Sequence, residues 1–259
     1  MRAAAPAAGT ALAGARAGAG AGGGGGRGVL LARVLPASVA VAEAFDDLAP
    51  APLFAAEQAL MAGRGERRRR QFATARTCAR RALAQLGQGG AALLPGPGGA
   101  PGWPAGTTGS ITHCEGYRAA AAVRTGAFLS LGIDAEPAHA LPAGVLSLAA
   151  GPGEQRHLAS LPQGEVPWDR LLFCAKEAVY KAWYPLGRRW LGLRDAEVRL
   201  DAAGTFSAVL RAGAVPAGVP WRYRGRWTAG QGLLLAAVAV PAAAPGAGGV
   251  AVVPVARAC

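Results

Sequence analysis

The chain of 259 residues has 27 basic residues, and only two of them, Lys176 and Lys181, are lysines. Glu177 stands four residues before Lys181, which places both side chains on one face of a helix. An ordinary helix-stabilising ion pair, worth about 0.2–0.5 kcal/mol, has the same spacing. In a chain that otherwise uses arginine, however, two retained lysines indicate positions where a compact ammonium is needed and a planar guanidinium does not fit. We therefore interpret this segment as functional.

Two carboxylates, Asp134 and Glu136, form a second group that could carry out chemistry. They lie two residues apart in a predicted strand, so both side chains point to the same side. Neighbouring carboxylates repel each other unless a proton or a cation neutralises them. Mg²⁺ is usually held by one or two carboxylates together with waters and substrate phosphates. A solvated pair on an edge strand is the alternative, and the presence of Glu177 as a third acid favours the metal site.

Phosphate-binding groups occur in two further segments. His113 ends a predicted strand that contains Ser110 and Thr112, and hydroxyl and imidazole groups can donate hydrogen bonds to a phosphate. A single histidine can equally be structural. The densest run of positive charge, 67–70 followed by Arg76, Arg80 and Arg81, is compatible with a solvated helix face or with a funnel for phosphates.

The elements that must position these residues follow from hydrophobic periodicity. The clearest helix spans 168–184, with Asp169 in its first turn and Pro185 as its expected stop. Residues 117–128 are rich in alanine and fit a helix or a strand. The other predicted helices are 51–60 and 66–86, and the other predicted strands are 109–113, 130–137, 196–200, 205–210, 221–227 and 233–240.

This order of elements predicts an α+β protein of two similar lobes with the carboxylates at the seam between them. We expect an N-terminal lobe over 29–136 and a C-terminal lobe over 137–243. The Gly/Ala-rich residues 1–28 are expected to be disordered, and residues 244–259 form a low-complexity tail.

Charge and cysteine usage limit the possible partners and location. The net charge of +12 should attract nucleic acid, a phosphorylated cofactor or an acidic protein. Four widely spaced cysteines show no metal-ligand spacing, which is typical of reduced thiols in a cytoplasmic protein. We expect no signal peptide and no membrane span.

Taken together, the motifs resemble the 4′-phosphopantetheinyl transferases of the Sfp type, and most closely their EntD-like branch. The resemblance extends over about residues 30–240. It rests on G-S-I-T-H-C-x-G-Y-R-A-A (109–120), G-I-D-A-E-P (132–137), L-L-F-C-A-K-E-A-V-Y-K-A-W-Y-P-L (171–186) and R-W-L-G (189–192). Upstream, R-R-x-F-x-x-x-R-x-C-A-R-x-A-L (69–83) and W-P-A-G (103–106) also match.

The resemblance implies an enzyme that moves the phosphopantetheine arm of coenzyme A to a serine of an apo carrier protein and releases 3′,5′-ADP. It implies two pseudo-symmetric lobes, each a small, mostly antiparallel sheet packed on a long helix, with the active site at the seam. The carriers would be acidic domains of siderophore, non-ribosomal peptide or polyketide synthases. Because both lobes lie in one chain, we expect a monomer.

The resemblance also implies roles for individual residues. Asp134, Glu136 and Glu177 would be the Mg²⁺ acids, and Glu177 would be the general base, directly or through water. Lys181 and Lys176 would offset phosphate charge. Thr112 and His113 would hold cofactor phosphates, and Arg76 and Arg80 would lie near the 3′-phosphate.

One departure from the pattern keeps a second hypothesis open. Gly99 stands about where this branch usually carries a basic residue, so the chain could be a weakened relative that binds coenzyme A or carrier protein. A nucleic-acid-binding protein is a more remote alternative. It would need aromatic residues interleaved with the basic run, and Phe72 is the one aromatic residue between 67 and 81.

Overall fold

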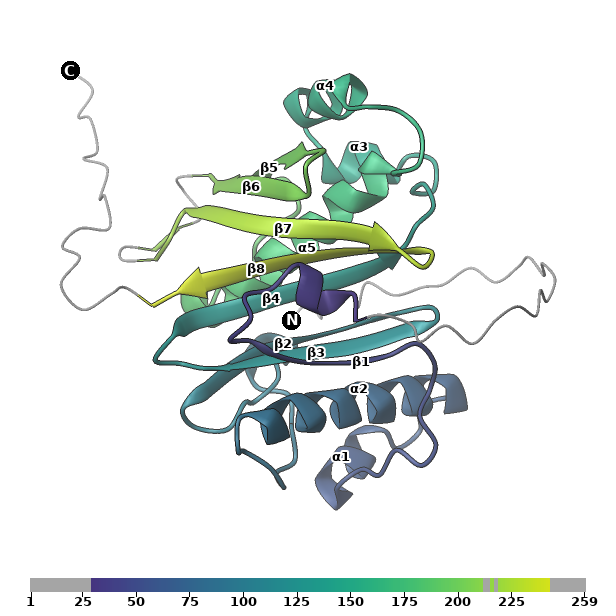
Figure 1. Cartoon of the computed structure of the whole chain (residues 1–259), viewed down its shortest axis with the longest axis vertical. Helices are drawn as coiled ribbons and strands as arrows, with labels where there is room; N and C mark the ends of the chain where they lie inside the picture. Colours follow the sequence, from purple (N-terminus) through teal and green to yellow (C-terminus); the bar gives the residue numbers. More distant parts are fainter. Residues whose placement is uncertain (1–28, 212–214, 217–218, 243–259) are drawn as a thin grey trace, which may run out of the picture.

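The computed structural model describes residues 29–211, 215–216 and 219–242 (Figure 1). These residues form two antiparallel sheets with strand orders β1-β3-β2 and β4-β8-β7-β6-β5, which confirms the predicted α+β class. The strands are β1 (Ala40–Ala44), β2 (Thr107–Cys114), β3 (Tyr117–Arg124), β4 (Phe128–Pro137), β5 (Ala196–Asp201), β6 (Thr205–Leu210), β7 (Arg222–Gly230) and β8 (Leu233–Pro241). The helical elements are η1 (Leu31–Arg33), α1 (Ala55–Leu60), α2 (Glu66–Gln85), η2 (Pro97–Gly99), α3 (Val145–Ala149), α4 (Pro152–Ser160) and α5 (Trp168–Gly187).

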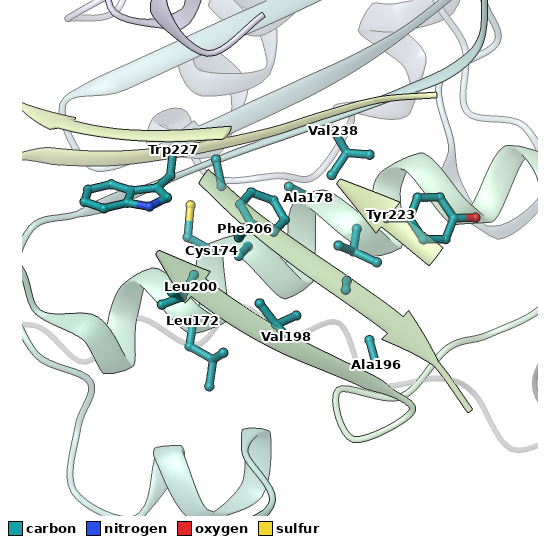
Figure 2. Close-up of a cluster of buried hydrophobic side chains, with 14 of the residues drawn as sticks. Leu172, Cys174, Ala178, Ala196, Val198, Leu200, Phe206, Tyr223, Trp227 and Val238 are labelled. Atoms are coloured by element: carbon teal, nitrogen blue, oxygen red, sulfur yellow. The ribbon is translucent and has the colours of Figure 1, made fainter. Parts of the chain in front are cut away.

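The helix α5 covers one face of the five-stranded sheet. Along β5 and β6 buried and exposed residues alternate strictly, so each strand directs every second side chain to the helix. Figure 2 shows Val198 and Leu200 of β5 and Phe206 of β6 packed with Leu172 of α5. None of the helices in the described part of the chain is long and apolar enough to cross a membrane.

The helix α2 packs on the three-stranded sheet through small side chains. Cys78, Ala79 and Ala82 of α2 are fully buried against Ala120 and Ala122 of β3. The alanine-rich segment therefore forms a strand, although alanine favours helices. The strands β1 and β2 pair with its two edges. The helix α2 covers one face, and the other face lies in a buried cluster with Leu31 and Ile133, so this tertiary context outweighs the local propensity.

The two sheets meet where β2 lies beside β4, and hydroxyl side chains bridge them. Ser110 Oγ accepts the Ile133 N–H at 3.1 Å, and Thr112 Oγ1 accepts the Ala135 N–H at 3.2 Å. Ser110, Thr112 and Ile133 are buried, so these contacts satisfy amides of β4 that have no water to bind. The seam thus fixes the position of Asp134, which lies between the two bonded amides.

Two expectations need correction, and three elements were not predicted. The strand β4 was expected in the N-terminal lobe, but it pairs with β8, so the sheets divide between β3 and β4. The helix α5 does not stop at Pro185 but continues to Gly187 and ends at Arg188, whose φ is 52°. Proline removes only one hydrogen bond, and the last turn tolerates that loss. The strand β1 and the helices α3 and α4 were not predicted; the expected terminal segments 1–28 and 244–259 lie outside the described residues.

Close contact between β4 and α5 depends on Gly132. A Cβ atom added there would lie 1.9 Å from the Ala178 carbonyl oxygen and 2.5 Å from the Ala182 nitrogen.

We expect Gly132→Ala to destabilise the protein by about 1–3 kcal/mol or more, because the helix would have to move off the strand. Urea unfolding measures this change. The control is Gly126→Ala, where a Cβ meets nothing within 4 Å, and equal stability of the two variants would contradict the prediction.

Candidate active site

A cavity of about 600 Å³ opens between α2, β2, the η2 loop and α5. Its lining combines the predicted residues His113, Glu177 and Lys181 with a basic wall. The β2 strand contributes residues 107–111, and those at 107–110 are small and leave room for a ligand. The seam between the lobes, where the chemistry was expected, therefore borders a cavity of a size typical for small ligands and cofactors.

The central contact of this site joins Lys181, Asp134 and Thr112. Lys181 Nζ lies 2.7 Å from Asp134 Oδ1 and donates to the Ile133 carbonyl at 3.1 Å. Thr112 Oγ1 donates to the same Asp134 oxygen at 3.0 Å. Burial lowers the pKa of Lys181, but Asp134 outweighs that effect and the pKa is raised. Lys181 is therefore a fixed cation at the mouth of the seam.

The other two acids are held differently. Arg170 Nη1 donates to Glu136 Oε2 at 2.9 Å, yet burial and the nearby Asp134 still raise the pKa of Glu136. Burial, followed by Asp134, raises the pKa of Glu177 to about 6, with Lys181 opposing the shift. A carboxylate with such a pKa remains ionised near neutral pH and is close to the optimum for a general base.

The donor set suits a hard divalent cation that a ligand helps to bind. Among the residues that the structure describes, no three His, Cys, Asp or Glu side chains form a metal-binding group by themselves. However, Asp134 Oδ2 is buried without a hydrogen-bond partner, and burial, followed by the like charge of Asp134, raises the pKa of both glutamates. Mg²⁺ commonly takes one or two carboxylates and completes its shell with water and phosphate. The observed acids fit that pattern.

The opposite wall of the cavity is cationic. Arg68 Nη1 lies 2.7 Å from His113 Nε2. Because arginine can only donate, this nitrogen is the acceptor and the proton sits on Nδ1. Desolvation and then Arg68 lower the pKa of His113, which keeps the ring neutral. Arg76 stacks on Phe72 at 4.4 Å, and its buried Nε lies 3.9 Å from Glu57 Oε1 but has no hydrogen-bond partner, so this guanidinium can still bind an anion.

The glycine-rich loop around η2 closes one side of the cavity. A Cβ atom added to Gly98 would lie 1.9 Å from the hydroxyl oxygen of Tyr184 and would collide with its ring, so the loop lies directly against α5. A Cβ atom on Gly99 would meet nothing within 4 Å, which leaves open space where a basic side chain was expected. Next to Tyr184, the Tyr180 ring packs against Trp190 at 5.2 Å and provides an apolar edge.

Two predicted site residues lie elsewhere. Lys176 is buried and binds Glu154, the Leu193 carbonyl and the Ala196 carbonyl, and it does not line the cavity. Arg80 donates to both carboxylate oxygens of Glu57, at 3.1 and 3.0 Å. Both cations satisfy buried carboxylates, so neither is free to bind a phosphate.

Two family models match the chain. The 4′-phosphopantetheinyl transferase N-terminal domain matches residues 56–123, and the 4′-phosphopantetheinyl transferase superfamily matches residues 130–229. The second match contains Asp134, Glu136, Glu177 and Lys181. The chain belongs to the 4′-phosphopantetheinyl transferase family.

Curated relatives agree over nearly their whole length. The transferase Svp of Streptomyces mobaraensis is 47% identical over 223 residues, which cover 83% of this chain and 91% of Svp. PptT of Mycobacterium tuberculosis is 44% identical over 227 residues, or 82% of this chain and 98% of PptT. Npt of Nocardia iowensis is 43% identical over 224 residues, or 81% of this chain and 99% of Npt.

In this transferase the sequence analysis missed Arg68 and Arg170 as site residues. Arg68 was treated as part of a basic run, but its spacing to Phe72, Ala75 and Arg76 (i, i+4, i+7, i+8) is that of one helix face, and all four line the cavity. That signal was available in the sequence. No spacing rule links Arg170 to Glu136, 34 residues away, because their contact depends on how α5 packs beside β4.

The reassignment of Lys176 gives a prediction for the transferase. Lys176→Met should lower the free energy of unfolding by about 3–5 kcal/mol, because Glu154 remains buried with an uncompensated charge. Denaturant unfolding measures this loss, and Lys176→Met/Glu154→Gln should recover part of it. The KM for coenzyme A should not change in either variant. Wild-type stability together with a raised KM would restore the cofactor-binding role for Lys176.

Proposed function

We propose that this enzyme transfers the 4′-phosphopantetheine arm of coenzyme A to a serine of an apo acyl or peptidyl carrier protein and releases 3′,5′-ADP. The single observation that carries the proposal is the contact of Lys181 with Asp134 and Thr112 on the border of a basic cavity. A fixed cation, a hydroxyl and a buried carboxylate with one free oxygen suit a pyrophosphate with its metal ion.

Coenzyme A binding follows from the charges of the cavity. We place the pyrophosphate near Thr112 and Lys181. The 3′-phosphate would lie against Arg68, Arg76 and His113, where the buried Nε of Arg76 has no hydrogen-bond partner. Guanidinium groups bind phosphates strongly because they offer several donors in a plane. The pantetheine arm would then pass the apolar edge formed by Tyr180 and Trp190.

The acids Asp134, Glu136 and Glu177 would hold Mg²⁺ together with the pyrophosphate. When bound, the ion would neutralise charge on the pyrophosphate and polarise it for attack. Arg170 supports this arrangement from outside the cavity. It binds Glu136 and is itself anchored to the carbonyls of His139 and Ala140 at 3.1 Å each, so it orients the Glu136 carboxylate.

The transfer step assigns a role to each remaining group. The serine oxygen of the carrier bonds to the phosphorus that bears the pantetheine arm, and the bond from that phosphorus to the bridging oxygen of the pyrophosphate breaks. Glu177 takes the serine proton, directly or through a water molecule. The electron pair of the broken bond stays on the departing 3′,5′-ADP, whose charge Lys181 offsets. Positioning and charge compensation supply most of the catalysis in such transfers.

The finer assignments rest on the sequence and are part of the proposal. The EntD-like motifs favour acidic carriers of siderophore, non-ribosomal peptide or polyketide synthases, which the net charge of +12 complements. We place the enzyme in the cytoplasm as a monomer. The second candidate, a weakened relative that binds coenzyme A without turnover, is motivated by the empty space beside Gly99.

The deciding experiment incubates the protein with coenzyme A, Mg²⁺ and an apo carrier domain. We expect the carrier to gain the mass of one phosphopantetheine arm, and we expect no gain when its acceptor serine is replaced by alanine or when Mg²⁺ is chelated. Coenzyme A binding without a mass gain would support the weakened relative. Absence of both binding and transfer would overturn the proposal.

Lys181 provides a specific test of the lysine requirement. Lys181→Arg keeps the charge but adds bulk between Asp134 and Ile133, so we expect kcat to fall by about 10²-fold. Steady-state kinetics of carrier modification measures the effect. The exposed Arg81 provides the control, since Arg81→Lys should leave kcat unchanged. Wild-type turnover by Lys181→Arg would show that the position needs a positive charge but not a lysine.

Glu177 can be tested by a neutral substitution of the same shape. Glu177→Gln should lower kcat by about 10²–10⁴-fold, because the serine proton loses its acceptor. Calorimetric titration should show coenzyme A binding within a few fold of wild type, since the phosphate-binding arginines are intact. If transfer persisted at the wild-type rate, the base would have to be another group.

A further inference from the structure

A second basic hollow lies on the opposite face of the five-stranded sheet from α5. It has a volume of about 600 Å³. Residues that alternate with the core positions of β5, β6 and β7 point to this side, while Figure 1 shows α5 behind the sheet and the purple N-terminal segment with η1 in front of it. Val34 and Pro36 of this N-terminal segment form one wall.

Three exposed arginines dominate the opposite wall. Ser207 pairs with Arg199 on one side and with Arg224 on the other, so the Cα atoms of these two arginines are about 10 Å apart. Arg226 follows two residues after Arg224, about 7 Å along the same strand face, and pairs with Thr205. Long arginine side chains at these separations can converge on one anion, with two hydroxyls between them.

These arginines lack the partners that other arginines of the protein have. Among the described residues, the side chains of Arg199, Arg224 and Arg226 form no ion pair or hydrogen bond, whereas six other arginines form ion pairs. One carboxylate, Asp201, lies on the lining, where it accepts the Ala203 N–H of its own turn. Three neighbouring guanidinium groups repel one another unless an anion is bound.

The shape of the hollow favours a small anion. Ala237 and Ala239 of β8 leave the floor free of bulky side chains, and the N-terminal wall limits its length. A volume of about 600 Å³ is typical of small-molecule sites. Guanidinium groups pair bidentately with phosphate oxygens, and the Ser207 and Thr205 hydroxyls can donate further hydrogen bonds.

We propose that this hollow, which we call the β-face anion site and which is defined by Arg199, Thr205, Ser207, Arg224 and Arg226, binds an oligophosphate anion. The ligand carries at least two linked phosphates, because the three arginines start from Cα atoms about 7 to 10 Å apart, which is wider than a single phosphate group. The site lies on the opposite face of the sheet from the proposed coenzyme A cavity and does not depend on it. It shares no lining residue with that cavity.

The test is a titration of isotopically labelled full-length protein with inorganic pyrophosphate, followed by NMR. The amide signals of Ser207 and Gly225 report on the β-face anion site, and those of Gly109 and Ser110 report on the main cavity. We expect both pairs to shift in the wild type. In Arg199→Gln/Arg224→Gln the Gly109 and Ser110 signals should shift as in the wild type, whereas the Ser207 and Gly225 signals should need at least about tenfold more pyrophosphate to shift.

Arg222→Gln is the matched control. Arg222 lies on the same face of β7, two residues from Arg224, but it stacks on Trp221 at 4.1 Å and does not line the hollow. This variant removes the same type of charge and should bind as the wild type does. Melting temperatures of the variants show that the substitutions of exposed residues leave the fold intact.

Titrations with inorganic phosphate and with ATP distinguish the kinds of phosphate ligand that the site could bind. Pyrophosphate should bind more tightly than inorganic phosphate, and ATP more tightly than pyrophosphate if the ligand is a nucleotide that also contacts Val34 and Pro36. Unshifted Ser207 and Gly225 signals in the wild type would overturn the proposal. So would equal responses to phosphate and pyrophosphate, or equal weakening in Arg222→Gln, because these indicate general charge screening.

Discussion

The structure depends on the replacement of a backbone ladder by side-chain hydroxyls where β2 meets β4. Ser110 and Thr112 accept the amides of Ile133 and Ala135, and Thr112 also donates to Asp134. A buried amide without a partner costs on the order of 1–3 kcal/mol, so these contacts hold the two sheets in one register. The same hydroxyl that joins the lobes therefore orients the central carboxylate of the site.

Around this seam, each charged side chain either has a specific partner of opposite charge or has a proposed role in the reaction. Lys181 neutralises one oxygen of Asp134, and Arg170 binds Glu136. Glu177 remains without such a partner, and its pKa rises to about 6. The result is a site with surplus negative charge at the seam and surplus positive charge on α2, which suits a ligand that brings both a metal ion and phosphates.

Basic residues of the same type have different roles that depend on their surroundings. Lys176 and Lys181 are five residues apart on α5, but one is enclosed by Glu154 and two carbonyls while the other borders the cavity. Arg76 and Arg80 share α2 and both lie near Glu57, yet Arg80 is hydrogen-bonded to it, whereas Arg76 Nε lies 3.9 Å away and has no hydrogen-bond partner. The lysine pair that marks the sequence thus contains one structural residue and one that we propose to be catalytic.

Much of the fold and of the site was predictable because the relevant signals are local. Strand-type runs separated by turn residues identified β5 to β8, helical periodicity identified α2 and α5, and the D-x-E and K-E-x-x-x-K spacings identified the acids and Lys181. The short strand β1, the choice of strand over helix for β3 and the placement of β4 in the second sheet were not predictable in this way. Each depends on a partner strand distant in the sequence, and pairing of distant strands outweighs local propensity.

By itself the sequence determined the family, the α+β class and the residues that could do chemistry, since these follow from residue type and spacing along one element. Only the tertiary structure decided which of the cations reach the cavity. Glu154 and Glu57 come from other elements and occupy Lys176 and Arg80, whereas Arg68 is brought to His113 across 45 residues. A buried carboxylate must be neutralised wherever the fold places it, and that requirement assigns the nearby cations.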